Sequence, residues 1–514
     1  MTEFTLWTEI EFSLESQSQS QSPFLEVEVN AIFTDSNGSE YLRPGFWDGG
    51  KNWRIRFAAP TVGQWSWKSS STNDDSGLAK QGDFFVTISE KLTGNRFYDN
   101  GFWKMSPKGR SLVHADNSPA LLAGDTAWGL PWRATPEEAL IYAQDRSKKG
   151  FNAALMMVVQ PDMFAVGPID RTADEGFDVA FEDLPNGHIN KIRPEFFQRF
   201  DVLSKTLADH GIASVLQPVF HGFGWKGLTT AGPNLDSVEA ARFARYLVAR
   251  YGARPVIYLV GADGTGNEPS IEAGGIAVEA LDCYKQPTGI HYRPHTKANK
   301  HQDAPWLDFQ WCQTGHIGEH LPERVADMYR NTPSKGVANG EPSYENGGKT
   351  GRSSGWWQGY EAWNNICAGG IMGAVYGAGS LWQWAHHGHE KGQSDFFLAP
   401  GCGWREALDF DGSTYFGLVQ KILGKLPLTD AEPAWELTIG SRGILVPDVI
   451  FVSFQEVGGA FLIVDERIPR FYKIIDPRNG ETLLEGERES GSHHHRTPET
   501  GDGPRVYIFT SKKI

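Results

Sequence analysis

Residues 119–158 read PALLAGDTAWGLPWRATPEEALIYAQDRSKKGFNAALMMV, and this stretch decides the fold that the sequence predicts. Apolar runs at 119–123 and 151–158 predict two short buried strands. Between them, Thr135 as N-cap and Glu138 three residues later form a capping box, which indicates a helix. The turn after the first strand, GDTAW, has one glycine, whereas a doubly wound sheet would normally carry a glycine-rich phosphate turn there. The unit therefore favours a (β/α)8 barrel over a doubly wound sheet.

The same alternation of strands and helices continues along the chain. One helix begins at Pro194 and ends before Gly211, and a second capping box, Asp236 with Glu239, begins the next helix. The further strands are expected at 212–219, 255–260, 289–292, 307–311 and 335–340 and within 371–384, with later helices at 321–331, 356–367 and 413–424. Eight strand–helix alternations predict an α/β chain whose residues 101–425 form a (β/α)8 TIM barrel.

Both ends of the chain show strand patterns instead. Residues 24–29 and 53–57 alternate in part, turn signals separate such runs, and no helical stretch is evident before residue 90. The region 1–100 is therefore predicted to be an N-terminal β-sandwich. Short apolar runs at 450–454 and 460–464 predict a second, C-terminal β-sandwich over 426–514.

Composition narrows the possible partners. The net charge is −15, from 48 basic and 63 acidic residues, which argues against nucleic acid or an anionic membrane as a partner. No apolar run approaches the 18 residues of a membrane span. The four cysteines form no CxxC pair, so free thiols are expected. We also expect no cofactor and no metal. The first residues lack a secretory pattern, which indicates the cytoplasm, or the periplasm or exterior if a signal was removed before this numbering. The oligomeric state stays open.

Polar and aromatic residues gather where the predicted strands end. These ends meet on one face of such a barrel, where active sites lie. The acids after strands four and seven, Asp263 and Glu341, suit glycoside cleavage, in which one carboxyl group protonates the leaving oxygen and the other attacks the anomeric carbon or activates water. The residues expected to bind the sugar are Asp125, Trp128, Gln160, His221, His316, Tyr344, Glu345, Trp382, Gln383 and Trp384. Glu345 fits a sugar contact and a structural role equally well.

Other chemistries have weaker signals. Residues 351–355 match G-x-S-x-G but follow a loop, whereas a serine hydrolase needs a preceding strand. The histidines at 386–389 and 493–495 lack H-E-x-x-H spacing. A lyase remains a minor alternative. A non-catalytic carbohydrate- or matrix-binding protein is the main alternative, although a pure binder has no need for acids after both strands.

The sequence also resembles the apiosidase-like family of glycoside hydrolases. The matching stretches are GFWDGGKNWRIRFAAPTVGQWSW, LLAGDTAW, GFNAALMMV, VIYLVGAD, QWCQTGH, NGEPSYE, GAGSLWQWAHHG and IIDPRNGE, in the family's order over nearly the whole chain. The resemblance implies a barrel with a preceding β-sandwich and a following small domain labelled as collagen-binding. It also implies Asp263 as general acid/base, Glu341 as nucleophile, and a retaining hydrolase.

One position departs from the family pattern. Two glycines and an aspartate are usual after strand four, whereas this chain has Gly261-Ala262-Asp263, followed by Asn267-Glu268-Pro269. Related barrels often carry their acid/base in an Asn-Glu-Pro motif, so Glu268 is the alternative to Asp263. The resemblance leaves the sugar open, and a plant or algal polysaccharide or oligosaccharide is the expected substrate.

Overall fold

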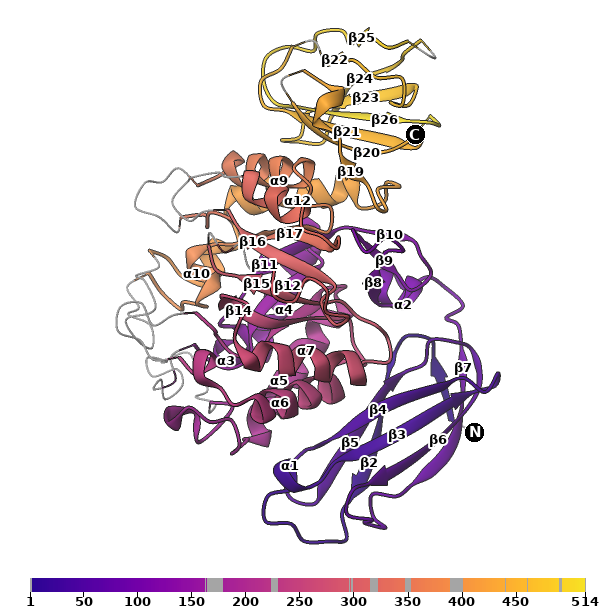
Figure 1. Cartoon of the computed structure of the whole chain (residues 1–514), viewed down its shortest axis with the longest axis vertical. Coiled ribbons are helices and arrows are strands. Elements are labelled where there is room, and N and C mark those ends of the chain that lie inside the picture. The colour runs from indigo at the N-terminus through magenta and orange to yellow at the C-terminus, as the bar shows by residue number, and fades with distance from the viewer. Residues whose placement is uncertain are drawn as a thin grey trace.

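A closed barrel of eight parallel strands forms the centre of the computed structural model (Figure 1). The structure describes residues 2–513 except 162, 164–178, 223–229, 295, 297–298, 315–321, 347–352, 389–400, 440, 460 and 490–491. The first barrel strand pairs with both the second and the eighth, which closes the barrel and confirms the predicted fold class. The barrel strands are β11 (Leu122–Thr126), β12 (Ala153–Met157), β13 (Ala213–Gln217), β14 (Val256–Gly264), β15 (Thr288–Tyr292), β16 (Phe309–Gln313), β17 (Gly336–Glu341) and β18 (Gly373–Tyr376).

Amphipathic helices surround the barrel and bury one face against it. In α5, Phe196, Phe200 and Leu203 follow helical spacing and are buried. Thr135 and Glu138 form the expected capping box at the start of α4. The helices are α3 (Leu130–Arg133), α4 (Pro136–Lys149), α5 (Pro194–Asp209), α6 (Ser237–Tyr251), α7 (Pro269–Leu281), α8 (Glu323–Tyr329), α9 (Trp356–Cys367), α10 (Gly379–Trp382), α11 (Trp404–Ala407) and α12 (Asp411–Leu423).

The structure differs from the sequence prediction in several places. The first barrel strand begins at Leu122, because residues 119–120 belong to a separate three-stranded sheet. The fourth strand continues to Gly264, so Asp263 lies inside it rather than beyond it. Among the described residues between β15 and β16 there is no helix. The small sheet consists of β8 (Trp103–Met105), β9 (Leu112–His114) and β10 (Pro119–Ala120), preceded by the short helix α2 (Arg96–Asn100).

The N-terminal region is one seven-stranded sheet that folds over on itself. β4 pairs with β3 through its first half and with β5 through its second, so the sheet bends at this strand. Phe12 and Phe84, from strands that do not pair, consequently pack with ring centroids 5.8 Å apart. The strands are β1 (Thr2–Thr5), β2 (Glu9–Glu15), β3 (Val29–Asp35), β4 (Glu40–Trp47), β5 (Asn52–Ala58), β6 (Gly63–Ser71) and β7 (Gln81–Thr87). A one-turn helix, α1 (Pro23–Glu26), lies where no helix was predicted.

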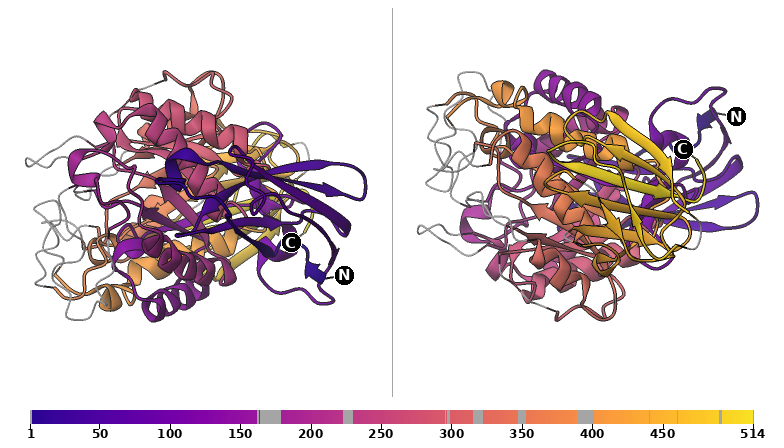
Figure 2. Two further views of the ribbon diagram at one scale, coloured as in Figure 1. Left: turned by 90° about the horizontal axis from the view of Figure 1, so that it is seen from below. Right: turned by 90° about the horizontal axis from the view of Figure 1, so that it is seen from above.

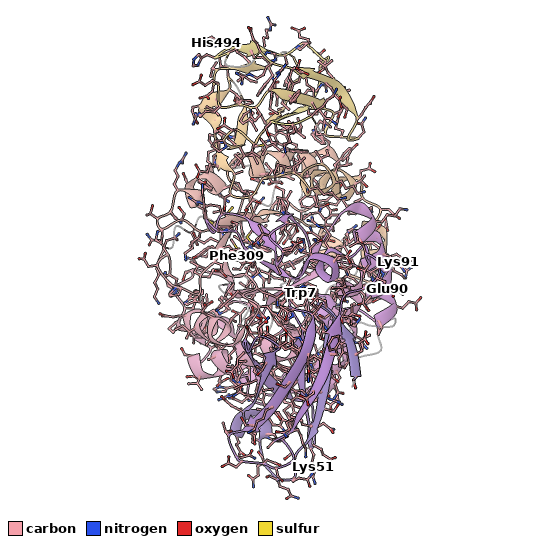
Figure 3. All side chains as sticks on the ribbon, turned by 90° about the vertical axis from the view of Figure 1, so that its right-hand side faces the viewer. Trp7, Lys51, Glu90, Lys91, Phe309 and His494 are labelled. Carbon is pink, nitrogen blue, oxygen red and sulfur yellow. The ribbon has the colours of Figure 1, made fainter. Side chains whose placement is uncertain are left out.

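Buried side chains join this sheet to the barrel. Arg43 is fully buried and donates from Nη2 to the carbonyl of Val248 at 2.9 Å. Trp7, labelled in Figure 3, packs on Phe102 and Tyr284 with centroids 5.0 and 6.2 Å apart. The sheet is therefore held against the barrel by polar and aromatic contacts together.

The C-terminal region packs on a different side of the barrel (Figures 1 and 2). Its six-stranded sheet and a two-stranded sheet enclose a core that includes Phe451, Phe461 and Phe509. Phe454 stacks on Trp363 of α9, with centroids 6.3 Å apart. The strands are β19 (Glu432–Pro433), β20 (Arg442–Val446), β21 (Ile450–Gln455), β23 (Phe471–Ile475), β24 (Thr482–Glu487) and β26 (Arg505–Thr510), with β22 (Leu462–Ile463) and β25 (His495–Arg496) in the smaller sheet. The division into domains of 1–100, 101–425 and 426–514 stays a proposal. In the described part of the chain, no helix has the length and apolarity to cross a membrane.

Candidate active site

A bulge in β14 sets the direction of Asp263. The pairing with β15 shifts register between Ala262 and Gly264, and Asp263 has a φ of 57°. A side chain other than glycine in this left-handed region costs about 1–3 kcal/mol, and bulges beside active sites often redirect a side chain. The redirected carboxylate accepts a hydrogen bond from Nε2 of Gln313 on β16.

A second bulge, in β17, positions Glu341. The pairing with β16 passes from Asn339 directly to Glu341 and omits Gly340. A Cβ atom at position 340 would lie 2.5 Å from the ring of Trp311, so the close approach of the two strands requires glycine here. Glu341 ends the strand and is 5% exposed.

The two bulges bring Asp263 and Glu341 together beside His291 of β15. One oxygen or nitrogen atom from each of the three side chains lies within 4.8 Å of the other two. His291 Nε2 is 3.2 Å from Oε2 of Glu341, and the hydroxyl of Tyr344 donates to Oε1 at 3.0 Å. Two carboxylates and an imidazole at this spacing could also ligate a divalent ion.

The electrostatics of the three groups differ. Burial and the charge of Glu341 raise the pKa of Asp263 to about 8, although His291 and the Gln313 hydrogen bond act in the opposite direction. Burial lowers the pKa of His291, but its hydrogen bond to Glu341 and the charges of both acids outweigh burial, and the net shift is upward. Of the two acids, Asp263 is therefore the one whose raised pKa lets it hold a proton at neutral pH.

Sequence reasoning missed His291, Gln313 and Gln217 as site residues. His291 lies within the predicted fifth strand, and it is fully buried with its ring directed to the two acids. The available signal was alternation, because in a barrel strand every second side chain points inward. A histidine at such a position on the strand next to Asp263 was a candidate partner for it.

Glu268 and His221 form a separate cluster at the start of α7. Glu268 is the N-cap of this helix, and its Oε1 accepts from the backbone N–H and the hydroxyl of Thr265, both at 2.9 Å. His221 Nε2 lies 3.2 Å from Oγ of Ser270, and burial lowers the pKa of His221 to about 4 despite the charge of Glu268. The hydrogen bonds of this cluster tie the loop after β14 to α7.

The three predicted tryptophans lie in different surroundings. Trp382 is half-buried and packs against Trp128 and Tyr344, with centroids 5.7 and 6.3 Å apart. Trp128 is 2% exposed. Trp384 is fully buried, where it stacks on Trp404 at 4.8 Å. Of the three tryptophans, Trp382 is thus the one that is partly exposed and also packs against Tyr344, whose hydroxyl bonds Glu341.

Other expected sugar contacts are occupied elsewhere or buried. Asp125 is fully buried and pairs with Arg146 of α4 at 2.5 Å, a structural contact that leaves it outside the proposed sugar site. Gln160 is buried, and buried Gln383 donates from Nε2 to the carbonyl of Gly379 at 3.2 Å. His316 lies outside the described residues.

Glu345 binds three separate parts of the barrel domain. Its Oε1 accepts from the backbone N–H of Gly355 at 2.7 Å and of Gly412 at 3.1 Å, and its Oε2 accepts from the hydroxyl of Tyr376 at 2.7 Å. Its side chain is buried. Of the two roles left open by the sequence, this geometry favours the structural one.

We expect Glu345→Gln to lower stability more than activity. An amide keeps one acceptor oxygen and turns an NH₂ group toward a donor, which leaves a buried polar group unsatisfied at a cost of about 1–3 kcal/mol. Thermal unfolding should show a lower midpoint, while kcat/KM at low temperature stays within about tenfold of wild type. Glu436→Gln, at a side chain 69% exposed, is the matched control and should leave both unchanged. A wild-type midpoint for Glu345→Gln would contradict the structural role.

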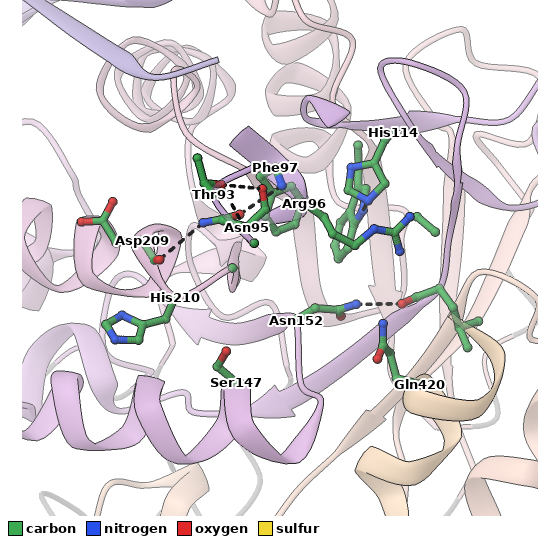
Figure 4. A pocket seen from close by; sticks show the side chains of 15 residues that line it. Thr93, Asn95, Arg96, Phe97, His114, Ser147, Asn152, Asp209, His210 and Gln420 are labelled. Atoms are coloured by element: carbon green, nitrogen blue, oxygen red, sulfur yellow. Dashed lines mark hydrogen bonds between the residues drawn. The ribbon is translucent and has the colours of Figure 1, made fainter. Parts of the chain in front are cut away.

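Two other polar features lie apart from the paired acids. A cavity of about 350 Å³ is lined by residues that include Asn95, Arg96 and Asn152 (Figure 4). The side-chain amides of Asn95 and Asn152 in this cavity donate to backbone carbonyls, so they link neighbouring elements of the structure.

The histidines at 493–495 lie in the C-terminal region, where His494 marks the outer end in Figure 3.

The parallel barrel with two carboxylates side by side at strand ends is an arrangement that suits glycoside cleavage. The profile of the family described as "Apiosidase-like, catalytic domain" matches residues 106–430, which is more than half of the chain. The chain therefore belongs to the apiosidase-like family of glycoside hydrolases. Residues 3–72 match a domain of unknown function, DUF5060. A search of curated proteins gives no match.

Solved structures with the same fold span most of the chain. A structure described as a glycoside hydrolase has a TM-score of 0.64 at 20% identity and covers 81% of this chain and 98% of its own. A family 5 glycoside hydrolase from Bacteroides vulgatus ATCC 8482 has the same score and identity, with coverage of 80% and 94%. Another protein of this bacterium, provisionally assigned as a glycoside hydrolase, has a TM-score of 0.72 at 18% identity and coverage of 99% and 100%. At these identities the likeness shows the fold alone.

Proposed function

We propose that the protein cleaves a glycosidic bond in a plant or algal polysaccharide or oligosaccharide with retention of configuration. Asp263 is the general acid/base and Glu341 the nucleophile. The observation that carries the choice of these two acids is that one oxygen atom of each lies within 4.8 Å of the other, and the retaining mechanism follows the resemblance to the apiosidase-like family. Retaining enzymes hold the two carboxyl groups about 5–5.5 Å apart, whereas inverting enzymes leave about 6.5–9.5 Å for a water molecule.

In the first step, Glu341 attacks the anomeric carbon while Asp263 gives its proton to the glycosidic oxygen. The bond between that carbon and that oxygen breaks, and the leaving sugar departs as a neutral alcohol. The raised pKa of Asp263 suits this step because the carboxyl group keeps its proton at neutral pH. The donors from Tyr344 and His291 suit the ionised state of Glu341.

In the second step, water replaces Glu341 at the anomeric carbon. Formation of the glycosyl ester removes the charge of Glu341, which had raised the pKa of Asp263. That pKa then falls, so Asp263, now ionised, can take a proton from the attacking water. The charge of Glu341 thus keeps Asp263 protonated as an acid before the ester forms, and the loss of this charge lets Asp263 act as a base afterwards.

The sugar contacts follow from what surrounds the two acids. Half-buried Trp382 is the proposed stacking surface, with Tyr344 beside it. His316 remains a proposed contact to a hydroxyl group, whereas Gln160, Gln383 and His221 are buried and are left out of the proposed sugar site. The binding-only alternative has no support once the chain belongs to a catalytic family.

We expect activity to be lost as the pH rises through about 8. Asp263 must be protonated in the free enzyme, and its pKa of about 8 sets the alkaline limb of kcat/KM. The measurement is a pH profile on a cleaved glycan. A nitrophenyl glycoside of the same sugar is the control, because its leaving group needs no proton and its glycosylation step should persist above pH 8. An alkaline limb that is identical for both substrates would speak against Asp263 as the acid.

Trapping of the ester tests the proposal directly. A screen of plant and algal glycans identifies a cleaved sugar, and its activated 2-fluoro analogue should label Glu341 covalently, detectable by peptide mass. Wild-type product should first appear with the anomeric configuration of the substrate. Inverted product would contradict the retaining mechanism. Activity that a chelator abolishes and a divalent ion restores would instead indicate metal chemistry at Asp263, His291 and Glu341.

A further inference from the structure

Gln217 approaches His291 from the side opposite to the acids. Gln217 ends β13, and its Nε2 is 2.9 Å from Nδ1 of His291. The other ring nitrogen, Nε2, is 3.2 Å from Glu341 Oε2. Both side chains are 0% exposed. Water therefore does not compete for either ring nitrogen, and protein groups decide where the ring carries its proton.

Two contacts agree on that position. An amide nitrogen can only donate, so it requires a lone pair on Nδ1. A carboxylate can only accept, so the approach of Glu341 Oε2 to 3.2 Å from Nε2 favours a proton on Nε2. The opposite tautomer would place a lone pair against the carboxylate and an N–H against the amide N–H, both buried.

We propose that Gln217 is a positioning residue, which fixes the neutral His291 ring as the Nε2–H tautomer so that it donates to Glu341. The inference deepens the proposed function because it rests on Glu341 as nucleophile. Tyr344 and His291 then hold one carboxylate oxygen each. This fixes the plane of the attacking group, as partners of a ligand or base usually do.

The other groups around the ring are consistent with this arrangement. Among the described residues, the titratable groups facing His291 are Asp263 on β14 and Glu341 on β17. β16 contributes Trp311, whose ring lies edge-on at 6.2 Å, and Gln313. Gln313 Nε2 is also a donor and lies 3.4 Å from His291 Nε2, which opposes an N–H there, but this contact is longer than those of Gln217 and Glu341, and the same nitrogen donates to Asp263. Gln217 thus acts on the one ring nitrogen that faces away from both acids.

Nitrogen NMR of the histidine-labelled full chain tests the tautomer without any substrate. The signal of His291 is identified by its loss in His291→Asn. At the alkaline end of its titration, where the ring is neutral, we expect Nε2 to carry the proton and Nδ1 to carry none. A protonated Nδ1 with a bare Nε2 overturns the proposal, and it does so whether or not the enzyme is a glycosidase.

Gln217→Glu tests the effect on activity. A carboxylate at 217 can only accept, so it should draw a proton onto Nδ1 and keep the ring doubly protonated to higher pH. With an imidazolium against Glu341, we expect kcat/KM to fall about tenfold to a hundredfold and the pH profile to change shape. The matched control is Gln310→Glu, at a barrel glutamine that is also 0% exposed but bonds Tyr292.

The outcomes separate the two proposals. If Gln217→Glu and Gln310→Glu give the same His291 titration and the same pH profile, Gln217 has no positioning role. If His291 has the expected tautomer but the fluoro sugar never labels Glu341, the proposed function fails while the assignment of the proton stands.

Discussion

Glu341→Gln should reduce turnover of a confirmed glycan by about three to six orders of magnitude. An amide oxygen cannot form the glycosyl ester, so the covalent route is closed. The fold should persist because glutamine has the same shape and keeps an acceptor for the Tyr344 hydroxyl, which bonds Glu341 at 3.0 Å. The measurement is kcat/KM together with the thermal midpoint of the same preparation.

Two further results distinguish loss of the nucleophile from general damage. Glu345→Gln changes the neighbouring acid in the same way and should stay within about tenfold of wild-type activity, since this residue bonds Gly355, Gly412 and Tyr376. Removal of the Glu341 charge should also lower the pKa of Asp263 from about 8, because that charge is one of its two main causes. Retained activity in Glu341→Gln with loss in Glu345→Gln would move the nucleophile to Glu345.

The periodicity of the sequence was sufficient to predict the barrel. Each of the eight strands overlaps its expected position, because a buried parallel strand is a short apolar run and the helices between carry caps such as Thr135 with Glu138. The proximity of Asp263 and Glu341 could also be predicted, because the C-terminal ends of the barrel strands lie on one face.

The roles of the other polar residues could not be predicted, because they depend on partners distant in sequence. Asp125 and Asp263 are both acids at strand ends, yet Arg146 from α4 pairs with Asp125, whereas Asp263 meets Glu341 and His291. The apolar pattern of the sequence also does not reveal the bulges at Asp263 and Gly340. Each bulge inserts one residue into a strand and so changes the face to which a side chain points.

We expect the largest loss of stability from a substitution in the buried ion cluster between the N-terminal sheet and the barrel. Asp201 of α5 accepts from Arg56 of β5 at 2.9 and 2.7 Å and from Arg250 of α6 at the same two distances. The side chains of Asp201, Arg56 and Arg250 are 13%, 6% and 0% exposed. Bidentate pairs of this kind fix three elements with one carboxylate.

We expect Asp201→Asn to destabilise the protein by about 3–5 kcal/mol, since it leaves two arginines buried with less compensating charge. Asp209→Asn on the same helix is the matched control. That residue is 42% exposed and bonds Lys205 and the hydroxyl of Tyr98. A surface ion pair of this kind contributes about 0.2–1 kcal/mol. Denaturant unfolding of both variants measures the difference, and equal losses would contradict a special role for Asp201.

The pH dependence of the Asp201 effect gives a second readout. Burial raises the pKa of Asp201, but Arg250 and Arg56 outweigh burial and hold it well below the usual value of 3.8. A depressed folded-state pKa contributes stability that is fully present above the unfolded-state pKa and is lost as the pH falls through the folded-state value. The gap between wild type and Asp201→Asn should therefore be constant near neutral pH and shrink below about pH 4. A gap that stays constant into strong acid would mean that the asparagine disturbs packing, and that the charge of Asp201 does not hold the sheet to the barrel.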